Sequence, residues 1–455
     1  MKYKVIIVIN VFILLLSSVF ILLDKQQRAK IRYVNMVEEN VNIIYLTHES
    51  NEEENNNYQE HILNGAVPEL EDGMIAVYYD NGWRKADLTE KWYSYEELKW
   101  ANVIVPKKEK LPELKNMEPH QIINEDDVQA YYVWIPRFEY KLFNVNYELV
   151  NEQIIDINFV NKDVLKKEVV ENGLYYTHPA FTAKYLDGST YELNGFWIAK
   201  FEPSLQDNIV IKPNQHPLVS LNMADMWNYA TNVSNDYGIA LQSRIITNIE
   251  WGAIAYFSYS PYGKQNNPNY EGTNKNIFVN AAMGNPNTWD NLVTGCSSGR
   301  INGLGMSNCA YQYNEEYYGT GASSTGTIYG IYDLAGGAWE CVMGIISNYP
   351  VADYRGGFNG SIPSETRYYT LYTESNNMFD YSRGLIGDAT RETRSNKILD
   401  KSWNGNLAYF ATSSFPWIKR GGTFRGGVYS GLFDYGITDA LPRGDKTFRI
   451  ILSKY

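Results

Sequence analysis

The first pattern along the chain is an almost unbroken apolar run over residues 5–23, interrupted only by Asn10, Ser17 and Ser18. Nineteen residues of this kind are long enough to cross the hydrocarbon core of a bilayer as a helix. Basic residues stand on both sides of the run, so they do not fix its orientation. We expect residues 1–32 to form an uncleaved signal anchor with a single transmembrane helix, which makes the lipid bilayer a partner. The alternative is a cleaved signal peptide, but no A-x-A-like cleavage site follows the run.

The next two segments differ in their patterning. Residues 33–64 are polar and acidic and predict a solvated spacer. Residues 65–130 alternate apolar and polar positions, and the turn Asp80-Asn81-Gly82 predicts a hairpin. We therefore expect a small β module over residues 65–130, with one aromatic core of its own built from Trp83, Trp92, Tyr93, Tyr95 and Trp100.

From residue 131 onward the pattern is one of short strands and long loops rich in Gly, Asn and Ser. The stretches 131–143 and 191–204 read as strands, and 222–237 and 247–260 carry apolar residues at helical spacing. Thr247 followed by Glu250 predicts a capping box at the start of the second helix. The sequence thus predicts an α+β domain with little regular structure over residues 131–455.

Composition and charge narrow the classes of function. The chain has 455 residues, a net charge of -12, 38 Tyr, five His and three Cys. So few His and Cys argue against a multi-metal enzyme or a disulfide scaffold, and the acidic balance argues against nucleic-acid binding. Cys296 and Cys309 flank a Gly/Ser/Asn loop, and their spacing leaves a disulfide undecided. Cys341 is expected to be a small buried residue.

The order of motifs in residues 195–449 resembles that of the formylglycine-generating-enzyme (sulfatase-modifying factor) family. The chain has GFWIAKFE at 195–202, RIITNIEW at 244–251, YGIYDLAGGAWEC at 329–341, RGGTF at 420–424 and TFR at 447–449. The resemblance implies a C-type-lectin-like fold. A wider resemblance, through phrases such as YYVWIPRFEYKLFN and GDATRET, is to membrane-anchored proteins of Gram-positive gut bacteria. It brings no established activity, but it implies a lectin-like domain displayed at the cell surface.

The family's enzymatic chemistry depends on two cysteines that bind copper and lie shortly after the RGGTF-like motif. By spacing these positions are Gly426 and Gly431 here, and no Cys lies beyond Cys341. Thiolates are required for that chemistry, so we expect the oxidase activity to be absent. A histidine-based site would have to recruit His178 or His216, which we interpret as turn-capping residues beside prolines.

The family also binds calcium near its G-N-x-W-E motif, which here reads Gly336-Gly337-Ala338-Trp339-Glu340. Hard cations prefer six to eight oxygen ligands, and Gly337 replaces the family's Asn. The resemblance therefore leaves Glu340 as a candidate calcium ligand. The alternative is a structural role in which Glu340 caps loop N–H groups behind Trp339.

Residues 420–449 are the predicted binding face. Gly421 and Gly422 allow positive φ or close backbone approach, and large amphipathic residues follow them. Residues 411–455 carry seven Lys or Arg and three Asp, which predicts a basic, aromatic surface. We expect exposure for Arg425, Tyr429 and Asp434 and leave Phe433 and Tyr435 undecided between surface and core. The predicted ligand-binding residues are Phe424, Arg425, Tyr429, Asp434, Tyr435 and Asp439.

These expectations favour a membrane-anchored, extracellular ligand-binding protein, an adhesin or a receptor, with a non-catalytic formylglycine-generating-enzyme-like domain. Its expected location is the cell membrane, with a single pass and the C-terminal domain outside the cell. The expected partner is a glycan or a protein ligand, and no nucleic acid. The alternatives are a divergent enzyme of the same family and a structural subunit of a surface appendage.

Overall fold

The computed structural model describes residues 66–148, 150–163, 169–281, 292–299, 309–395 and 399–454. The predicted anchor over residues 5–23 and the whole predicted spacer over residues 33–64 lie outside this part of the chain. Within it, no helix is both long and apolar enough to cross a membrane.

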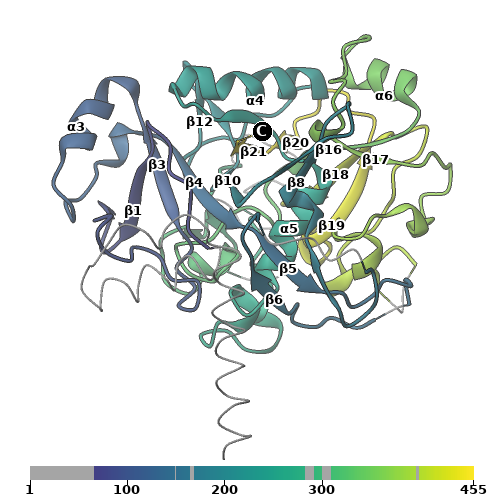
Figure 1. The fold of residues 1–455 in the computed structure, drawn as a ribbon, viewed down its shortest axis with the longest axis horizontal. Helices are drawn as coiled ribbons and strands as arrows, with labels where there is room; N and C mark the ends of the chain where they lie inside the picture. Colours follow the sequence, from purple (N-terminus) through teal and green to yellow (C-terminus); the bar gives the residue numbers. More distant parts are fainter. Residues whose placement is uncertain are drawn as a thin grey trace, which may run out of the picture. The chain divides into compact units, whose positions relative to one another are not determined.

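An antiparallel sheet of seven strands forms the first half of the core (Figure 1). Its hairpin of β1 and β2 is the one predicted, with Tyr79 paired to Trp83 and positive φ at Asn81 and Gly82. In spatial order the strands are β13 (Gln242–Ile245), β21 (Ile450–Ser453), β10 (Gly195–Ala199), β4 (Val128–Pro136), β3 (Asn102–Pro106), β1 (Ile75–Tyr79) and β2 (Trp83–Lys85).

This sheet runs across the predicted domain boundary at residue 130. Strand β4 pairs with β3 on one side and with β10 on the other, so residues 65–130 are not a separate module. The expected separate aromatic core is wrong for the same reason. Trp100 stacks on Phe257 with ring centroids 4.1 Å apart, and Trp83 contacts Tyr131 and Tyr329. Residues 65–130 complete the main core instead.

A second, mixed sheet carries most of the predicted binding segment. Strand β16 pairs in parallel with β17 and β20 and antiparallel with β18, which pairs with β19. Its strands are β16 (Trp339–Ile346), β17 (Thr370–Tyr372), β18 (Trp417–Gly421), β19 (Gly431–Thr438) and β20 (Lys446–Phe448). Smaller sheets contain β5 (Phe138–Lys141), β6 (Ile157–Phe159) and β7 (Tyr175–Thr177); β8 (Thr182–Lys184) and β9 (Thr190–Glu192); β11 (Ser204–Leu205) and β12 (Ile209–Val210); and β14 (Cys296–Ser297) and β15 (Tyr311–Gln312).

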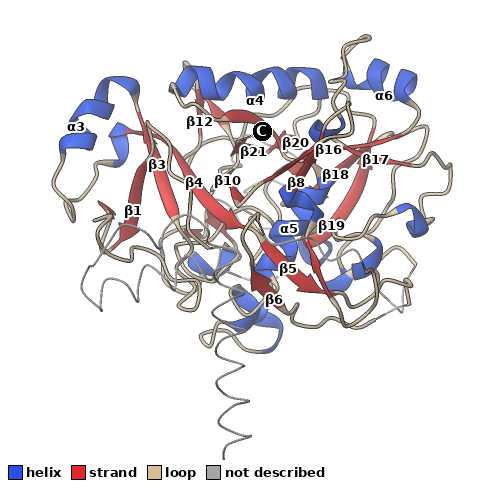
Figure 2. Ribbon diagram, viewed as in Figure 1, coloured by secondary structure: helices blue, strands red, loops and turns tan. Residues whose placement is uncertain are grey.

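Both predicted helices are confirmed among the described residues (Figure 2). The α-helices are α3 (Leu111–Asn116), α4 (Met223–Tyr237), α5 (Asn248–Ser258) and α6 (Tyr349–Gly356). The 3-10 helices are η1 (Lys108–Lys110), η2 (Glu125–Asp127), η3 (Pro179–Phe181), η4 (Lys264–Asn266), η5 (Gly272–Lys275), η6 (Thr320–Ala322), η7 (Thr366–Tyr368), η8 (Tyr381–Arg383), η9 (Arg391–Thr393), η10 (Trp403–Gly405) and η11 (Gly427–Tyr429).

Helix α5 connects the two sheets. The predicted capping box is present, because Thr247 Oγ1 accepts a hydrogen bond from the Glu250 N–H and the Glu250 carboxylate accepts one from the Thr247 N–H. Trp251 donates its indole N–H to the Leu432 carbonyl on β19, at 3.0 Å, and Phe257 stacks on Trp100, which lies two residues before β3 of the first sheet. All of α5 except Ile249 is buried, so the core is continuous between the sheets and the described chain is an α+β structure.

Candidate functional site

The predicted binding segment is a tight loop between β18 and β19. Gly421 and Gly422 have φ of 81° and 76°, so the predicted need for glycine here is confirmed. A Cβ atom at residue 422 would lie 2.4 Å from Ser430 Oγ. The chain therefore folds back on itself over residues 422–431, which we call the 422–431 loop.

The structure divides the six predicted ligand-binding residues between surface and core. Arg425 and Tyr429 are exposed as expected, Tyr429 with 52% of its surface accessible. Lys401 places its ammonium group 3.9 Å from the centre of the Tyr429 ring. Asp439 is half-buried, and the remaining three residues are buried: Phe424, Asp434 and Tyr435. Phe433, also left undecided, lies in the core too.

The expected exposure of Asp434 is wrong, because the first six residues of β19 are buried on both faces of the strand. Burial raises the pKa of Asp434 well above its usual range, although Lys419 and Arg420 oppose the shift. Its Oδ1 atom has no hydrogen-bond partner in the described structure. Burial therefore disfavours the ionised form of Asp434, which is not accessible at the surface.

The predicted basic surface is smaller than expected, since three of the seven cations of residues 411–455 are buried. Arg449 forms an ion pair with Glu340, and Lys446 donates to Thr438 Oγ1 at 2.7 Å and contacts Asp439 at 3.4 Å. Arg420 is also buried and donates to the Ala389 carbonyl. These three charges are therefore not available to a ligand at the surface.

Glu340, the candidate calcium ligand, has both carboxylate oxygens engaged by Arg449. The Arg449 Nε atom donates to Glu340 Oε2 at 2.7 Å, and Nη2 donates to Oε1. This ion pair, rather than the capping of loop N–H groups, is its structural role. Among the described residues no cluster of three or more His, Cys, Asp or Glu is placed to hold a metal ion. The arrangement around Glu340 does not fit a calcium site.

Gly426 and Gly431, which stand by spacing where the family that the chain resembles has cysteines, are closely packed against neighbouring side chains. A Cβ atom at residue 426 would lie 2.1 Å from Ser430 Oγ, and one at residue 431 would lie 2.5 Å from Asn406 Oδ1. The remaining free thiol, Cys341, is buried as expected, and burial raises its pKa to about 11. It is therefore protonated at neutral pH and far from the reactive thiolate form.

The histidines interpreted as turn-capping residues are engaged locally. His178 Nδ1 accepts the Ala180 N–H at the start of η3, and burial lowers the His178 pKa to about 3. The ring nitrogen Nδ1 of His216 lies 2.9 Å from the Leu292 carbonyl oxygen. The cap at His178 is confirmed, while His216 bonds to another segment of the chain.

A small open pocket lies beside the 422–431 loop. Its lining comes from the end of α5, from residues 264–277, from Asn404 and Asn406, and from residues 430–432. Its enclosed space is only about 20 Å³, and the figure rises to about 400 Å³ when the open solvent at its mouth is counted. We call it the Asn404 pocket. Part of its lining is apolar and is formed by three buried residues, Tyr259, Ile277 and Leu432.

Polar groups converge at one side of the Asn404 pocket. The Tyr259 hydroxyl lies 3.0 Å from the Asn404 side-chain amide and donates to Glu152 Oε2 at 3.1 Å. Glu152 Oε1 accepts the backbone N–H of Asn404 at 2.7 Å. Asn276 Oδ1 accepts from Gln265 Nε2 at 3.4 Å. Burial raises the pKa of Tyr259 well above its usual range, so its hydroxyl stays protonated and donates.

The wall that carries Asn404 is held by its backbone conformation and its neighbours. Asn404 and Gly405 both have positive φ, 62° and 71°, a conformation that Asn and Gly tolerate best. Ser402 Oγ donates to the Phe433 carbonyl at 2.6 Å, and Asn406 Oδ1 accepts the Phe433 N–H at 3.2 Å. These bonds fix the wall to β19.

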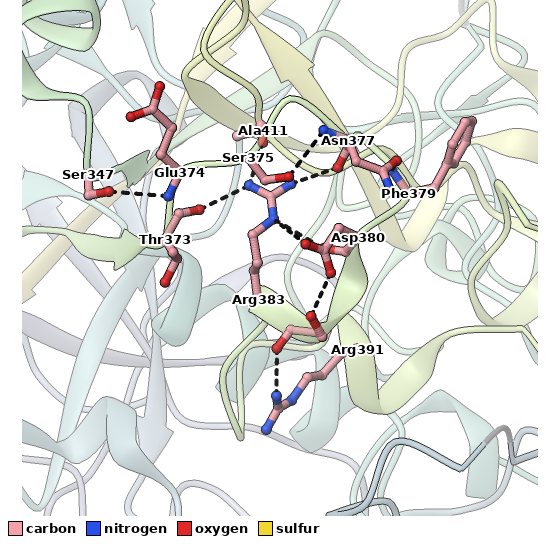
Figure 3. Close-up of polar contacts among 11 residues, drawn as sticks. Ser347, Thr373, Glu374, Ser375, Asn377, Phe379, Asp380, Arg383, Arg391 and Ala411 are labelled. Carbon is pink, nitrogen blue, oxygen red and sulfur yellow. Dashed lines mark hydrogen bonds and ion pairs between the residues drawn. The ribbon is translucent and has the colours of Figure 1, made fainter.

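Arg383 organises the neighbouring loop, as Figure 3 shows. Its guanidinium donates to the carbonyls of Thr373 at 3.1 Å, Ala411 at 2.8 Å and Asn377 at 3.0 Å. Its Nε atom donates to the Asp380 carbonyl. One buried cation thus binds four loop carbonyls. These contacts hold together the two ends of the segment 373–411, which contains the pocket residues Asn404 and Asn406.

Cys296 and Cys309 form a disulfide, with Cα atoms 5.2 Å apart, which decides the pairing that spacing left undecided. Disulfides persist in oxidising compartments such as the extracellular space.

Sequence reasoning missed the Asn404 pocket entirely. Its lining residues come from three stretches that are distant in the chain, 258–277, 404–406 and 430–432, and no motif links them. The one signal was the Asn404-Gly405 pair, which in sequence predicts only a turn. Glu152 and Asn276 carry no local signal at all.

Comparisons with known proteins add little to this geometry. No family model matches the chain, and no curated protein matches it. Among solved structures, PvdO from Pseudomonas aeruginosa is similar with a TM-score of 0.29 and 11% identity, over 73% of this chain and 96% of that chain.

Two further structures are similar at the same low level. The Major Tropism Determinant I1 variant has a TM-score of 0.28 and 9% identity, over 72% of this chain and 64% of that chain. Treponema denticola variable protein 1 has a TM-score of 0.25 and 11% identity, over 71% of this chain and 96% of that chain. These scores are too low to assign the fold.

Proposed function

We propose that this chain is a membrane-anchored, extracellular ligand-binding protein whose C-terminal domain has a non-catalytic, C-type-lectin-like fold of the formylglycine-generating-enzyme kind. The anchor is the apolar run over residues 5–23, with a single pass and the domain outside the cell. The ligand is a glycan that binds at the 422–431 loop and the Asn404 pocket. The disulfide between Cys296 and Cys309 supports an oxidising, extracellular location.

One observation carries the proposal. Where, by sequence spacing, the enzymes that this chain resembles have a cysteine pair, the chain has glycines packed against Ser430 and Asn406, and it exposes Tyr429 and Arg425 nearby. An exposed aromatic ring beside a polar pocket provides contact area and hydrogen-bonding groups without nucleophilic chemistry.

In the described part of the chain, the buried acids that an enzyme could use lie away from the lining of this pocket. The fully buried acids whose pKa values are raised include Glu202, Asp333, Glu340, Glu392 and Asp434, and none of them lines the Asn404 pocket. The wall residue Tyr259 is a donor held by Glu152 and not a base. Binding is therefore the better-supported function.

The test is binding of the full-length protein, in detergent micelles, to an array of glycans. Tyr429→Ala should abolish or strongly weaken binding, because it removes the exposed ring. Tyr354→Ala is the matched control, since Tyr354 is an exposed tyrosine on α6, with 79% of its surface accessible, and does not line the pocket. Binding that Tyr429→Ala leaves unchanged would exclude the 422–431 loop as the site.

A further inference from the structure

We infer that the glycan bound at the 422–431 loop is acidic, and that Lys401 binds the carboxylate of a uronic acid whose ring contacts Tyr429. This inference rests on the proposed function and names its ligand class. It follows from the surroundings of the Lys401 ammonium group, from the attachment of Lys401 to the 422–431 loop, and from the balance of charges around Tyr429.

The ammonium group of Lys401 makes no hydrogen bond to the described part of the chain. It lies 3.9 Å from the centre of the Tyr429 ring, and its ion pair with Asp400 Oδ2 is also 3.9 Å long. An N–H···O hydrogen bond spans about 2.7–3.2 Å, so neither contact satisfies the N–H donors of the ammonium. Only 12% of the side chain is accessible, so water replaces the missing acceptors incompletely. An anionic group of a ligand would supply them.

The backbone holds Lys401 beside Tyr429. Lys401 and Leu407 pair in an antiparallel bridge, and the Leu407 N–H donates to the Tyr429 carbonyl at 3.1 Å. Asn406 Nδ2 also donates to the Ser430 carbonyl at 3.3 Å. Because these bonds join the two segments, the ammonium group and the Tyr429 ring, with 52% of the residue accessible, form one surface that a single sugar residue is large enough to contact.

The charges around Tyr429 favour an anionic ligand. Arg425 lies in the same loop and is exposed, while Asp400 has 33% of its side chain accessible. Asp434 adds little negative charge, because burial raises its pKa well above its usual range. Lys401 and Arg425 are thus opposed by one ionised acid. This balance suits a ligand with a single negative charge, a carboxylate, better than a doubly charged phosphate, which proteins commonly bind with clustered arginines.

The experiment compares acidic trisaccharides with their methyl esters, in which the negative charge is removed. Full-length protein in detergent micelles is titrated calorimetrically with trisaccharides of galacturonic, glucuronic and mannuronic acid, and with the methyl ester of each. We expect at least one free acid to bind about tenfold or more tightly than its ester, because the ester loses the charge-assisted hydrogen bond to Lys401. The preference should shrink at high salt, since the charges lie near the surface.

Two substitutions at Lys401 locate the effect. Lys401→Met keeps an apolar side chain and removes the charge, so it should reduce the preference for the free acid about tenfold. Lys401→Arg keeps the charge and should restore most of the preference, which a merely structural role would not require. Lys99→Met is the matched control, because Lys99 is an exposed lysine outside the loop, paired with Glu97 at 2.6 Å, and its replacement should leave the preference intact.

The other outcomes overturn the inference. Equal affinity for acid and ester, with both lost in Tyr429→Ala, would refute the anionic assignment while leaving the proposed glycan site in place. A preference for the free acid that Lys401→Met leaves unchanged would refute the role of Lys401. Tighter binding of glucose 6-phosphate than of glucuronic acid would identify a phosphate instead of a carboxylate. If no acidic sugar binds, the inference fails, and the glycan array decides the proposed function separately.

Discussion

Glu392 gives the sharpest stability prediction, because it is a buried carboxyl group that titrates near neutral pH. It accepts hydrogen bonds from the hydroxyls of Tyr256 at 2.9 Å and Tyr140 at 3.1 Å, and from the Gly387 N–H at 2.5 Å. Burial raises its pKa from 4.5 to about 7, and Asp388 adds to the shift. The perturbation is Glu392→Gln, which keeps the shape of the side chain and removes its titration.

The direction and magnitude of the effect on the unfolding free energy follow from proton linkage. The folded protein binds the Glu392 proton more tightly than the unfolded chain does, so this stabilisation is complete below pH 4.5 and is lost as the pH rises through about 7. A difference of about 2.5 pKa units corresponds to about 3 kcal/mol. The difference in unfolding free energy between wild type and Glu392→Gln should therefore change by about 3 kcal/mol between pH 4.5 and pH 8.

Neighbouring groups set the design of the assay. The pKa of His178 is lowered to about 3 by burial, so its contribution is present above pH 6.5 and is lost as the pH falls through about 3. That contribution opposes the one from Glu392, but it is common to both proteins and cancels in the difference. Urea unfolding of full-length protein, followed by tryptophan fluorescence at several pH values, measures each free energy.

The direction of the change is the critical result. Wild type should gain stability relative to Glu392→Gln as the medium becomes more acidic, and lose it as the pH rises above 7. Parallel pH profiles for the two proteins would refute the assignment of a raised pKa to Glu392. If Glu392→Gln instead became more stable relative to wild type in acid, the pKa of Glu392 would have to be lowered and not raised in the folded protein.

Three further predictions concern stability. Lys200→Met should cost about 3 kcal/mol, because it strands three acceptors, Asn102 Oδ1 and the carbonyls of residues 328 and 330; urea unfolding measures this, and an unchanged midpoint contradicts it. Thr247→Ala should cost about 1–2 kcal/mol through loss of the α5 cap, read from the same curves, whereas a neutral effect would assign no role to the cap. Replacing Cys296 and Cys309 by Ser should cost about 3 kcal/mol, since the bond closes a loop with sequence separation 13; a melting temperature that reductant leaves unchanged in wild type would argue against it.

The sequence by itself determined the local elements. The hairpin at residues 75–85 follows from alternation and from an Asn-Gly turn, and the helix from Asn248 follows from apolar spacing and its Thr-Glu cap. These features depend on residues a few positions apart, whose interactions are already present in a short stretch of chain. The glycines at 421 and 422 belong to the same class, because backbone φ is a local property.

Only the tertiary structure decided which residues are buried and which distant residues come together at a site. Residues 65–130 look like an independent module in sequence, but β4 needs hydrogen-bond partners on both edges and takes one from each side of the predicted boundary. Asp434 and Tyr435 are adjacent on β19 and look amphipathic, yet both are buried because the strand is covered on both faces. The Asn404 pocket joins three distant stretches, and only the packing of α5 and β19 brings them together.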